Sequence, residues 1–364
     1  MPDADENVGT EPGDEVQGLP RRRWQRKAKE AGYAHPSMVT SLDEAVCIGS
    51  VPGLAAASSS KIEVIFDMET GDPDDVLTLL LLAANPVVNL RAVTITPGAS
   101  DQVALVLWIL QKLNLRVRVG AQDWPRNAEK KCLRGKFYDS FGRVPDTALQ
   151  GAGVEQATQV LLECCDAGTT LLTGGPLHNL GAALAIGGLS LGRWVAQGGF
   201  AGDGVVPPHL QMKKFAGQRT CQTWNFNGNR PAAEAALASK AIDKKVLVSK
   251  NVCHQVVYDS RLHDAFREAA SAANPDTARG FALKLLYHAM CNYSRGDGKK
   301  LHDPLAMAAA VDESVCEFRE VQVFRDAQGW GSRLEPGTQT WISVDYDDER
   351  FRQIILGYDG CDGT

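Results

Sequence analysis

From residue 61 onwards, short apolar runs of strand-like composition alternate with longer segments in which apolar residues recur at helical spacing. The first run, residues 62–66, is rich in β-branched residues, and a helix-like apolar run at 77–84 follows it closely. Repeated strand–helix alternation predicts an α/β fold with a mostly parallel sheet and helices on both faces. Connections between the parallel strands should be right-handed.

Further elements follow from the same two patterns along the rest of the chain. Period-2 or continuous apolar runs predict strands at 90–96, 115–119, 169–173, 195–200, 245–249 and 341–344. Helical spacing predicts helices at 101–113, 154–167, 176–186 and 231–239. No repeat with a fixed period interrupts this order, so the sequence predicts one continuous α/β unit.

The first 60 residues differ in composition from the rest. Acidic residues gather at the start, a basic cluster occupies 21–27, and an Ala/Ser segment occupies 54–60. Such a stretch offers little apolar surface to bury. We therefore expect residues 1–60 to be a disordered extension and residues 61–364 to form a single α/β domain.

Composition narrows the classes of function. The chain is 44% hydrophobic with a net charge of −6, which gives no sign of a nucleic-acid or acidic-membrane partner. No apolar run reaches the roughly 18 residues of a membrane span. Nine cysteines, an odd number without a Cys-x-x-Cys pair, favour reduced thiols, a cytoplasmic location and no zinc site.

Residues 67–75 concentrate negative charge where the first strand meets the first helix. The acids in this segment are Asp67, Glu69, Asp72, Asp74 and Asp75. Asp72 before Pro73 is typical of a helix N-cap, with the proline at the first helical position. Capping accounts for Asp72 and one further acid, but not for acids at the carboxyl end of a strand. This corner therefore indicates an enzyme site that binds a cation or a hydroxyl-rich ligand.

Later segments add polar groups at similar corners. A Gly-Gly-Pro turn at 173–179 follows a predicted strand, and asparagines alternate with aromatics at 224–229, where Asn225 has a strand-like context. His302 precedes Asp303 and Pro304, a second pattern typical of an N-cap followed by proline. The polar, glycine-rich segment 294–300 before it has the composition of a loop that closes over a site.

Taken in order, these segments resemble the inosine/uridine-preferring nucleoside hydrolase family. The resemblance rests on 67–75, on the turn at 173–179, on Gly198–Gly199, on 222–225 and on His302-Asp303-Pro304, and it extends over residues 62–356. It implies the family's Rossmann-like fold. It also implies hydrolysis of an N-glycosidic bond, which yields a free base and a pentose from a small nucleoside substrate.

The resemblance also implies a calcium ion and a set of roles. The expected calcium ligands are Glu69, Asp75, Asp303 and the backbone carbonyl of Gly174. Asp74, Asn225 and Trp224 are expected to bind the substrate. The expected base is Glu69 or Asp67, and the expected acid is His302. Homo-oligomers are a further implication.

Four departures from the family pattern leave alternatives open. Glu69 stands where the family has aspartate, and the loop before Asp74 has one extra residue. Residues 97–100 replace an asparagine expected after the second strand, and Thr223 stands where relatives carry a glutamate that contacts the sugar. One alternative is a relative that binds calcium and nucleoside without turnover. Another is a haloacid-dehalogenase-like, magnesium-dependent phosphatase with Asp67 as the nucleophile. The sequence does not name the base or the sugar.

Overall fold

The computed structural model describes residues 61–124, 133, 136–142, 153–293 and 298–357. Its centre is a ten-stranded sheet with the order β3-β2-β1-β4-β5-β7-β12-β10-β11-β6. The strands from β3 to β12 pair in parallel, and the pairs from β12 to β6 are antiparallel. The predicted α/β class with a mostly parallel sheet is confirmed.

The strands lie close to the predicted runs. The parallel strands are β1 (Ile62–Met68), β2 (Val88–Ile95), β3 (Arg118–Ala121), β4 (Thr169–Thr173), β5 (Leu191–Gln197), β7 (Ile242–Val248) and β12 (Thr340–Tyr346). The antiparallel end consists of β10 (Cys316–Arg325), β11 (Trp330–Leu334) and β6 (Thr220–Cys221). A separate two-stranded sheet consists of β8 (Val257–Tyr258) and β9 (Lys299–Lys300). The strand predicted at 115–119 begins only at Arg118, because only Arg118–Ala121 pair with β2.

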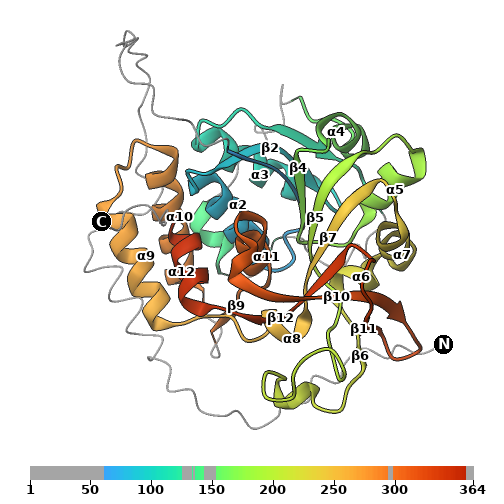
Figure 1. Cartoon of the computed structure of the whole chain (residues 1–364). Coiled ribbons are helices and arrows are strands. Elements are labelled where there is room, and N and C mark those ends of the chain that lie inside the picture. The colour runs from blue at the N-terminus through green and yellow to red at the C-terminus, as the bar shows by residue number, and fades with distance from the viewer. Residues whose placement is uncertain (1–60, 125–132, 134–135, 143–152, 294–297, 358–364) are drawn as a thin grey trace, which may run out of the picture.

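Helices cover both faces of the sheet, as predicted (Figure 1). One face carries α2 (Asp74–Ala84), α3 (Ser100–Lys112), α9 (Ser260–Ala272), α10 (Ala278–Asn292), α11 (His302–Val311) and α12 (Asp348–Leu356). The other carries α4 (Ala157–Cys164), α5 (His178–Ile186) and α7 (Arg230–Ala238). Short helical turns are α6 (Trp224–Gly228), α8 (Lys250–Cys253), η2 (Tyr138–Phe141), η4 (Lys213–Phe215) and η5 (Glu313–Val315).

Strand β1 explains why its sequence is continuously apolar. Phe66 and Met68 pack into the core under α2, whereas Ile65 packs into the core under α4 and α5. Successive side chains of a strand point to opposite faces, and here both faces are covered. All three side chains are fully buried.

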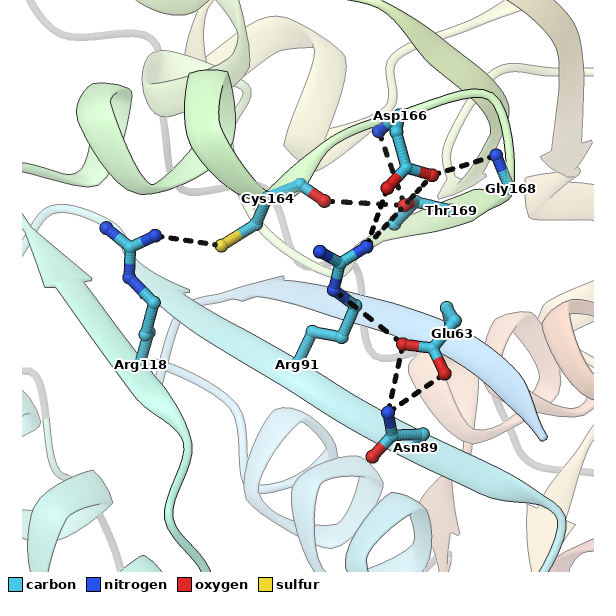
Figure 2. A network of polar contacts seen from close by, with 8 residues as sticks. All are labelled: Glu63, Asn89, Arg91, Arg118, Cys164, Asp166, Gly168 and Thr169. Carbon is cyan, nitrogen blue, oxygen red and sulfur yellow. Dashed lines mark hydrogen bonds and ion pairs between the residues drawn. The ribbon is translucent and has the colours of Figure 1, made fainter.

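Polar contacts tie the amino ends of neighbouring strands together (Figure 2). Arg91 of β2 donates to Asp166 at 2.8 Å and lies 3.6 Å from Glu63 of β1. Asp166 also accepts from the hydroxyl of Thr169 at the start of β4. This network fixes the edge of the sheet away from the strands' carboxyl ends, where open α/β sheets place their ligands.

Two predicted helix caps are wrong. Helix α2 begins at Asp74, and the Pro73 carbonyl accepts its first helical bond from Leu77, so Pro73 holds the cap position and Asp72 does not cap. Helix α11 begins at His302, so Asp303 lies inside the first turn. Both predictions assumed a local cap. In the fold, a carboxylate from another element binds the α11 terminus, as described below.

The sheet order also determines where a ligand can bind. Strand β1 lies between β2 and β4, and β5 and β7 continue in the other direction, so the strand order reverses beside β1. Ligands of such sheets bind at the carboxyl ends of the strands near this reversal. Among the described helices, none has the length and apolar character needed to cross a membrane. Residues 1–60 lie outside the described residues, so the predicted division of the chain stays a prediction.

Candidate functional site

A cavity of about 360 Å³ opens at the carboxyl ends of β1, β4, β5 and β7. The residues that line it are Glu69, Gly71, Asp72, Asp74, Asp75, Gly174, Gln197, Thr223, Trp224, Asn225, Lys250, His254, His302 and Asp303. Every residue predicted from the sequence for the site, except Asp67, therefore borders one cavity. Segments more than 200 positions apart in the chain meet here because parallel strands end at the same edge of the sheet.

Three buried carboxylates form the floor of this cavity. Asp74, Asp75 and Asp303 each place a carboxylate oxygen within 4.8 Å of the other two. Asp75 accepts a hydrogen bond from the backbone N–H of Glu69 at 2.9 Å. Asp74 accepts from the backbone N–H groups of His302 at 3.0 Å and Asp303 at 3.3 Å, so it takes the place of the predicted local cap of α11.

This packing of like charges calls for a cation. Burial, the charge of Asp303 and that of Glu69 raise the pKa of Asp75 well above its usual value. Burial and the charge of Asp74 do the same to the pKa of Asp303. Asp303 Oδ1 is buried and has no hydrogen-bond partner among the described residues. Oxygen donors arranged in this way fit a hard cation such as Ca²⁺.

Gly174 brings backbone up against the carboxylates. A Cβ atom at Gly174 would lie 2.8 Å from Asp75 Oδ1, so a larger residue does not fit. The Gly174 carbonyl accepts from the side-chain amide of Asn225 at 2.8 Å, and that amide also donates to Gln197 Oε1 at 2.7 Å. Asn225 lies in the short helix α6 rather than in the predicted strand-like context, because Trp224–Gly228 turn back to begin the approach to α7.

Glu69 points toward Trp224 rather than into the carboxylate cluster. The Trp224 indole N–H donates to Glu69 Oε1 at 3.0 Å, although the indole is 69% exposed at the mouth of the cavity. Glu69 does not belong to the group of mutually close ligand atoms, whereas Asp74, which we predicted to bind substrate, does. The predicted ligand role of Glu69 and substrate role of Asp74 stay predictions.

Asp67 lies behind the cavity wall. Its Oδ1 accepts from Thr94 Oγ1 and from Asn179 Nδ2, each at 2.7 Å. Burial raises the pKa of Asp67 to about 6, and the two hydrogen bonds oppose this rise. The side chain is fully buried and does not border the cavity. Asp67 therefore supports the corner from beneath.

His302 borders the cavity beside a second histidine. Its ring centroid lies 4.9 Å from that of His254, and its Nδ1 has no partner among the described residues. Burial and the charge of Lys299 lower the pKa of His302 to about 3. At neutral pH the ligand-free protein therefore carries a neutral imidazole here, which bears directly on the predicted acid role.

Lys299 contacts the carboxylates of the site, and the sequence analysis missed it. Its ammonium is buried, 1% exposed, and lies 2.9 Å from Asp72 Oδ1 and 3.1 Å from Asp74 Oδ1. It comes from β9, after residues 294–297 of the predicted closing loop, which lie outside the described residues. No local pattern links a lysine to acids more than 200 positions away, so only the fold reveals this contact.

Other residues were also missed. Thr94 pairs with Asp67 in the register of β2 and β1, and this contact could have been found once the strands were placed side by side. Strand register does not reveal the other missed residues, because each lies on a different element from its partners. These residues are Asn179, Gln197, Lys250 and His254.

Comparisons with known proteins match most of this chain. The model of the family described as "Inosine-uridine preferring nucleoside hydrolase" matches residues 64–353. An uncharacterized protein of Aquifex aeolicus (strain VF5) is 28% identical over 311 residues, which cover 81% of this chain and 98% of that protein.

Solved structures share the fold. A purine-preferring ribonucleoside hydrolase from Gardnerella vaginalis has a TM-score of 0.61 at 19% identity, covering 81% of this chain and 97% of that one. A plant nucleoside hydrolase has a TM-score of 0.58 at 20% identity, covering 82% and 99%. An inosine-uridine preferring nucleoside hydrolase from Bacillus anthracis has 0.57 at 18%, covering 81% and 98%. With the family model matched along 64–353 and the predicted fold in place, this chain belongs to the inosine-uridine preferring nucleoside hydrolase family.

Proposed function

We propose that this protein hydrolyses the N-glycosidic bond of a nucleoside, or of a nucleoside-like N-glycoside, to a free base and a pentose in a calcium-dependent reaction. The observation that carries the proposal is the meeting of Asp74, Asp75 and Asp303 with Gly174 and Asn225 at one cavity. Family membership supports the reaction class.

In this reaction water adds to the anomeric carbon while the bond to the base nitrogen breaks. The electron pair of that bond leaves with the base, which takes up a proton, and the water loses one. Positive charge develops on the sugar ring in the transition state. With the sugar bound above them, the carboxylates of the cavity floor would stabilise that charge.

The oxygen atoms of the site are suitable ligands for calcium. Asp75, Asp303 and the Gly174 carbonyl would hold it, with Asp74 beside them, and Asp303 Oδ1 is an acceptor still without a partner. When bound, calcium would supply positive charge that neutralises the carboxylates and orients sugar hydroxyls. The side-chain carbonyl of Asn225 would accept a hydrogen bond from a sugar hydroxyl. The side-chain NH₂ group is already held by the Gly174 carbonyl and by Gln197 Oε1, which fixes the orientation of this amide.

Two observations favour Glu69 over Asp67 as the base. Glu69 borders the cavity, where its carboxylate accepts a hydrogen bond from the Trp224 indole N–H. Asp67 is buried behind the wall and engaged by Thr94 and Asn179. The position of His302 at the cavity supports its role as the acid, whereas its low pKa opposes that role. Replacement of His302 by alanine tests the role.

The proposal is tested by release of free base from a panel of purine and pyrimidine nucleosides, with calcium and with a chelator. Turnover that needs calcium supports it. Calcium-dependent binding without any base release would instead support a binding protein that has lost turnover. A cytoplasmic location and assembly into homo-oligomers are further parts of the proposal, tested by fractionation and by mass measurement in solution.

A further inference from the structure

A second group of residues at the cavity is positively charged. Lys250 and His254 border the cavity. Burial, the neighbouring His302 and the charges of Lys214, Lys250 and Lys300 lower the pKa of His254 to about 2. Among the described residues, the ammonium groups of Lys250 and Lys214 contact the Gln222 carbonyl and His254 rather than a carboxylate. The cavity therefore combines a carboxylate floor with a wall of cations that no described carboxylate pairs.

Hydrogen bonds define the position of this wall. The Lys250 ammonium donates to the Gln222 carbonyl at 2.8 Å, which places it beside Thr223. Thr223 borders the cavity and is 3% exposed, and its Oγ1 is buried without a hydrogen-bond partner among the described residues. The Lys214 ammonium contacts His254 Nδ1 at 2.9 Å.

This combination of donors suits an anionic oxygen. A buried hydroxyl without a partner carries a desolvation penalty, which a ligand atom would remove. The Lys250 ammonium at the same cavity has two further N–H donors, and hydrogen bonds between ionised partners are roughly twice as strong as neutral ones. A neutral sugar hydroxyl would use one donor and leave the positive charge of the wall uncompensated.

We propose that the substrate carries an anionic group, a phosphate or a carboxylate, and that Lys250 and Thr223 bind it. The inference rests on the proposed hydrolase function and narrows its substrate to a nucleotide or an acidic nucleoside. The anionic group takes no part in bond breaking. It orients the substrate in the cavity, with the sugar over the carboxylate floor and the anion against the lysines.

The test compares kcat/KM for uridine, uridine 5′-monophosphate and orotidine, and for inosine and inosine 5′-monophosphate. We expect at least one anionic substrate to be favoured over its neutral counterpart by about tenfold or more, since a charged hydrogen bond contributes about 1.5–3 kcal/mol. Uridine 5′-monophosphate and orotidine distinguish a sugar phosphate from a base carboxylate. Lys250→Met should abolish the preference, whereas Lys250→Arg should keep most of it.

Lys240→Met is the matched control, because Lys240 is exposed on the segment before β7 and does not border the cavity. This variant should leave the ratio of kcat/KM for the anionic substrate to kcat/KM for its neutral counterpart unchanged. Equal or faster hydrolysis of the neutral nucleosides, or a ratio that Lys250→Met does not alter, would overturn the inference.

A binding measurement separates this inference from the proposed function. If no compound of either charge is hydrolysed, the proposed function fails, and thermal shifts still decide on the anion site: ribose 5-phosphate is compared with ribose for a sugar phosphate, and orotate with uracil for a base carboxylate. Stabilisation by only the anionic member of either pair, lost in Lys250→Met, supports the site. Equal shifts within both pairs, or a shift that Lys250→Met retains, reject it.

Discussion

Lys299 places one buried positive charge against two carboxylates of the site. Its buried ammonium contacts Asp74, which is as buried as the lysine, and Asp72, whose side chain is 38% exposed. Asp74 in turn holds the first turn of α11 through the N–H groups of His302 and Asp303. Replacing Lys299 with methionine keeps the length and apolar stem of the side chain and removes only the charge.

The expected loss of stability can be estimated from these contacts. Removing one partner of a buried ion pair typically costs 3–5 kcal/mol, because the other charge stays buried without compensation. Asp72 can turn part of its charge toward solvent, so we expect the lower end, about 3 kcal/mol of unfolding free energy at neutral pH. The loss should shrink as the pH falls, because protonation of the acids removes the uncompensated charge.

Urea unfolding of the parent protein and of Lys299→Met, without added metal, measures this difference. The matched control is Arg261→Met, which breaks the Arg261–Glu349 ion pair at 2.7 Å between side chains that are 65% and 61% exposed. That change should cost less than about 1 kcal/mol. Calcium should restore more stability to Lys299→Met than to the parent, because it supplies positive charge at the same carboxylates. If Lys299→Met unfolds at the same urea concentration as the control, the reasoning is wrong.

Three further predictions concern individual site residues. Asp303→Asn should raise the melting temperature of the metal-free protein, because it relieves repulsion in the cluster. The same change should abolish calcium-induced stabilisation, measured by calorimetry, and turnover, measured by base release. Retention of calcium-induced stabilisation or of turnover would count against the metal site. Burial raises the pKa of Asp67 from 3.8 to about 6, so its ionisation should cost about 3 kcal/mol of stability as the pH rises from 4 through 6. Asp67→Asn should flatten this part of the pH–stability profile, and an unchanged profile would reject the assignment. His302→Ala should slow nucleosides with poor leaving groups far more than an activated nitrophenyl riboside, and equal slowing of both in steady-state assays would remove the acid role.

Local pattern alone was sufficient for the parallel part of the sheet and the helices that connect it, whereas the antiparallel strands β10, β11 and β6 and the helices α9 and α10 were not predicted. Alternating apolar runs predicted a mostly parallel sheet with helices on both faces, because strands buried on both sides must be apolar throughout, as in Ile62–Met68. The acids of 67–75 and the pair His302–Asp303 also stood out as sites. Each lies where a strand or loop meets a helix, and each carries more acidic or polar groups than capping of that helix requires.

Contacts between distant segments were decided only by the tertiary structure. The sequence predicted that Asp72 and Asp303 cap their own helices, whereas Asp72 pairs with Lys299 and the α11 terminus is held by Asp74. Local rules favour the nearest acceptor, but in the fold another element offers a buried carboxylate that needs donors. The same reason hid Lys250 and its place beside Thr223 at the cavity. Their chemistry depends on sharing one cavity wall, and the order of strands β1, β4, β5 and β7 determines that wall.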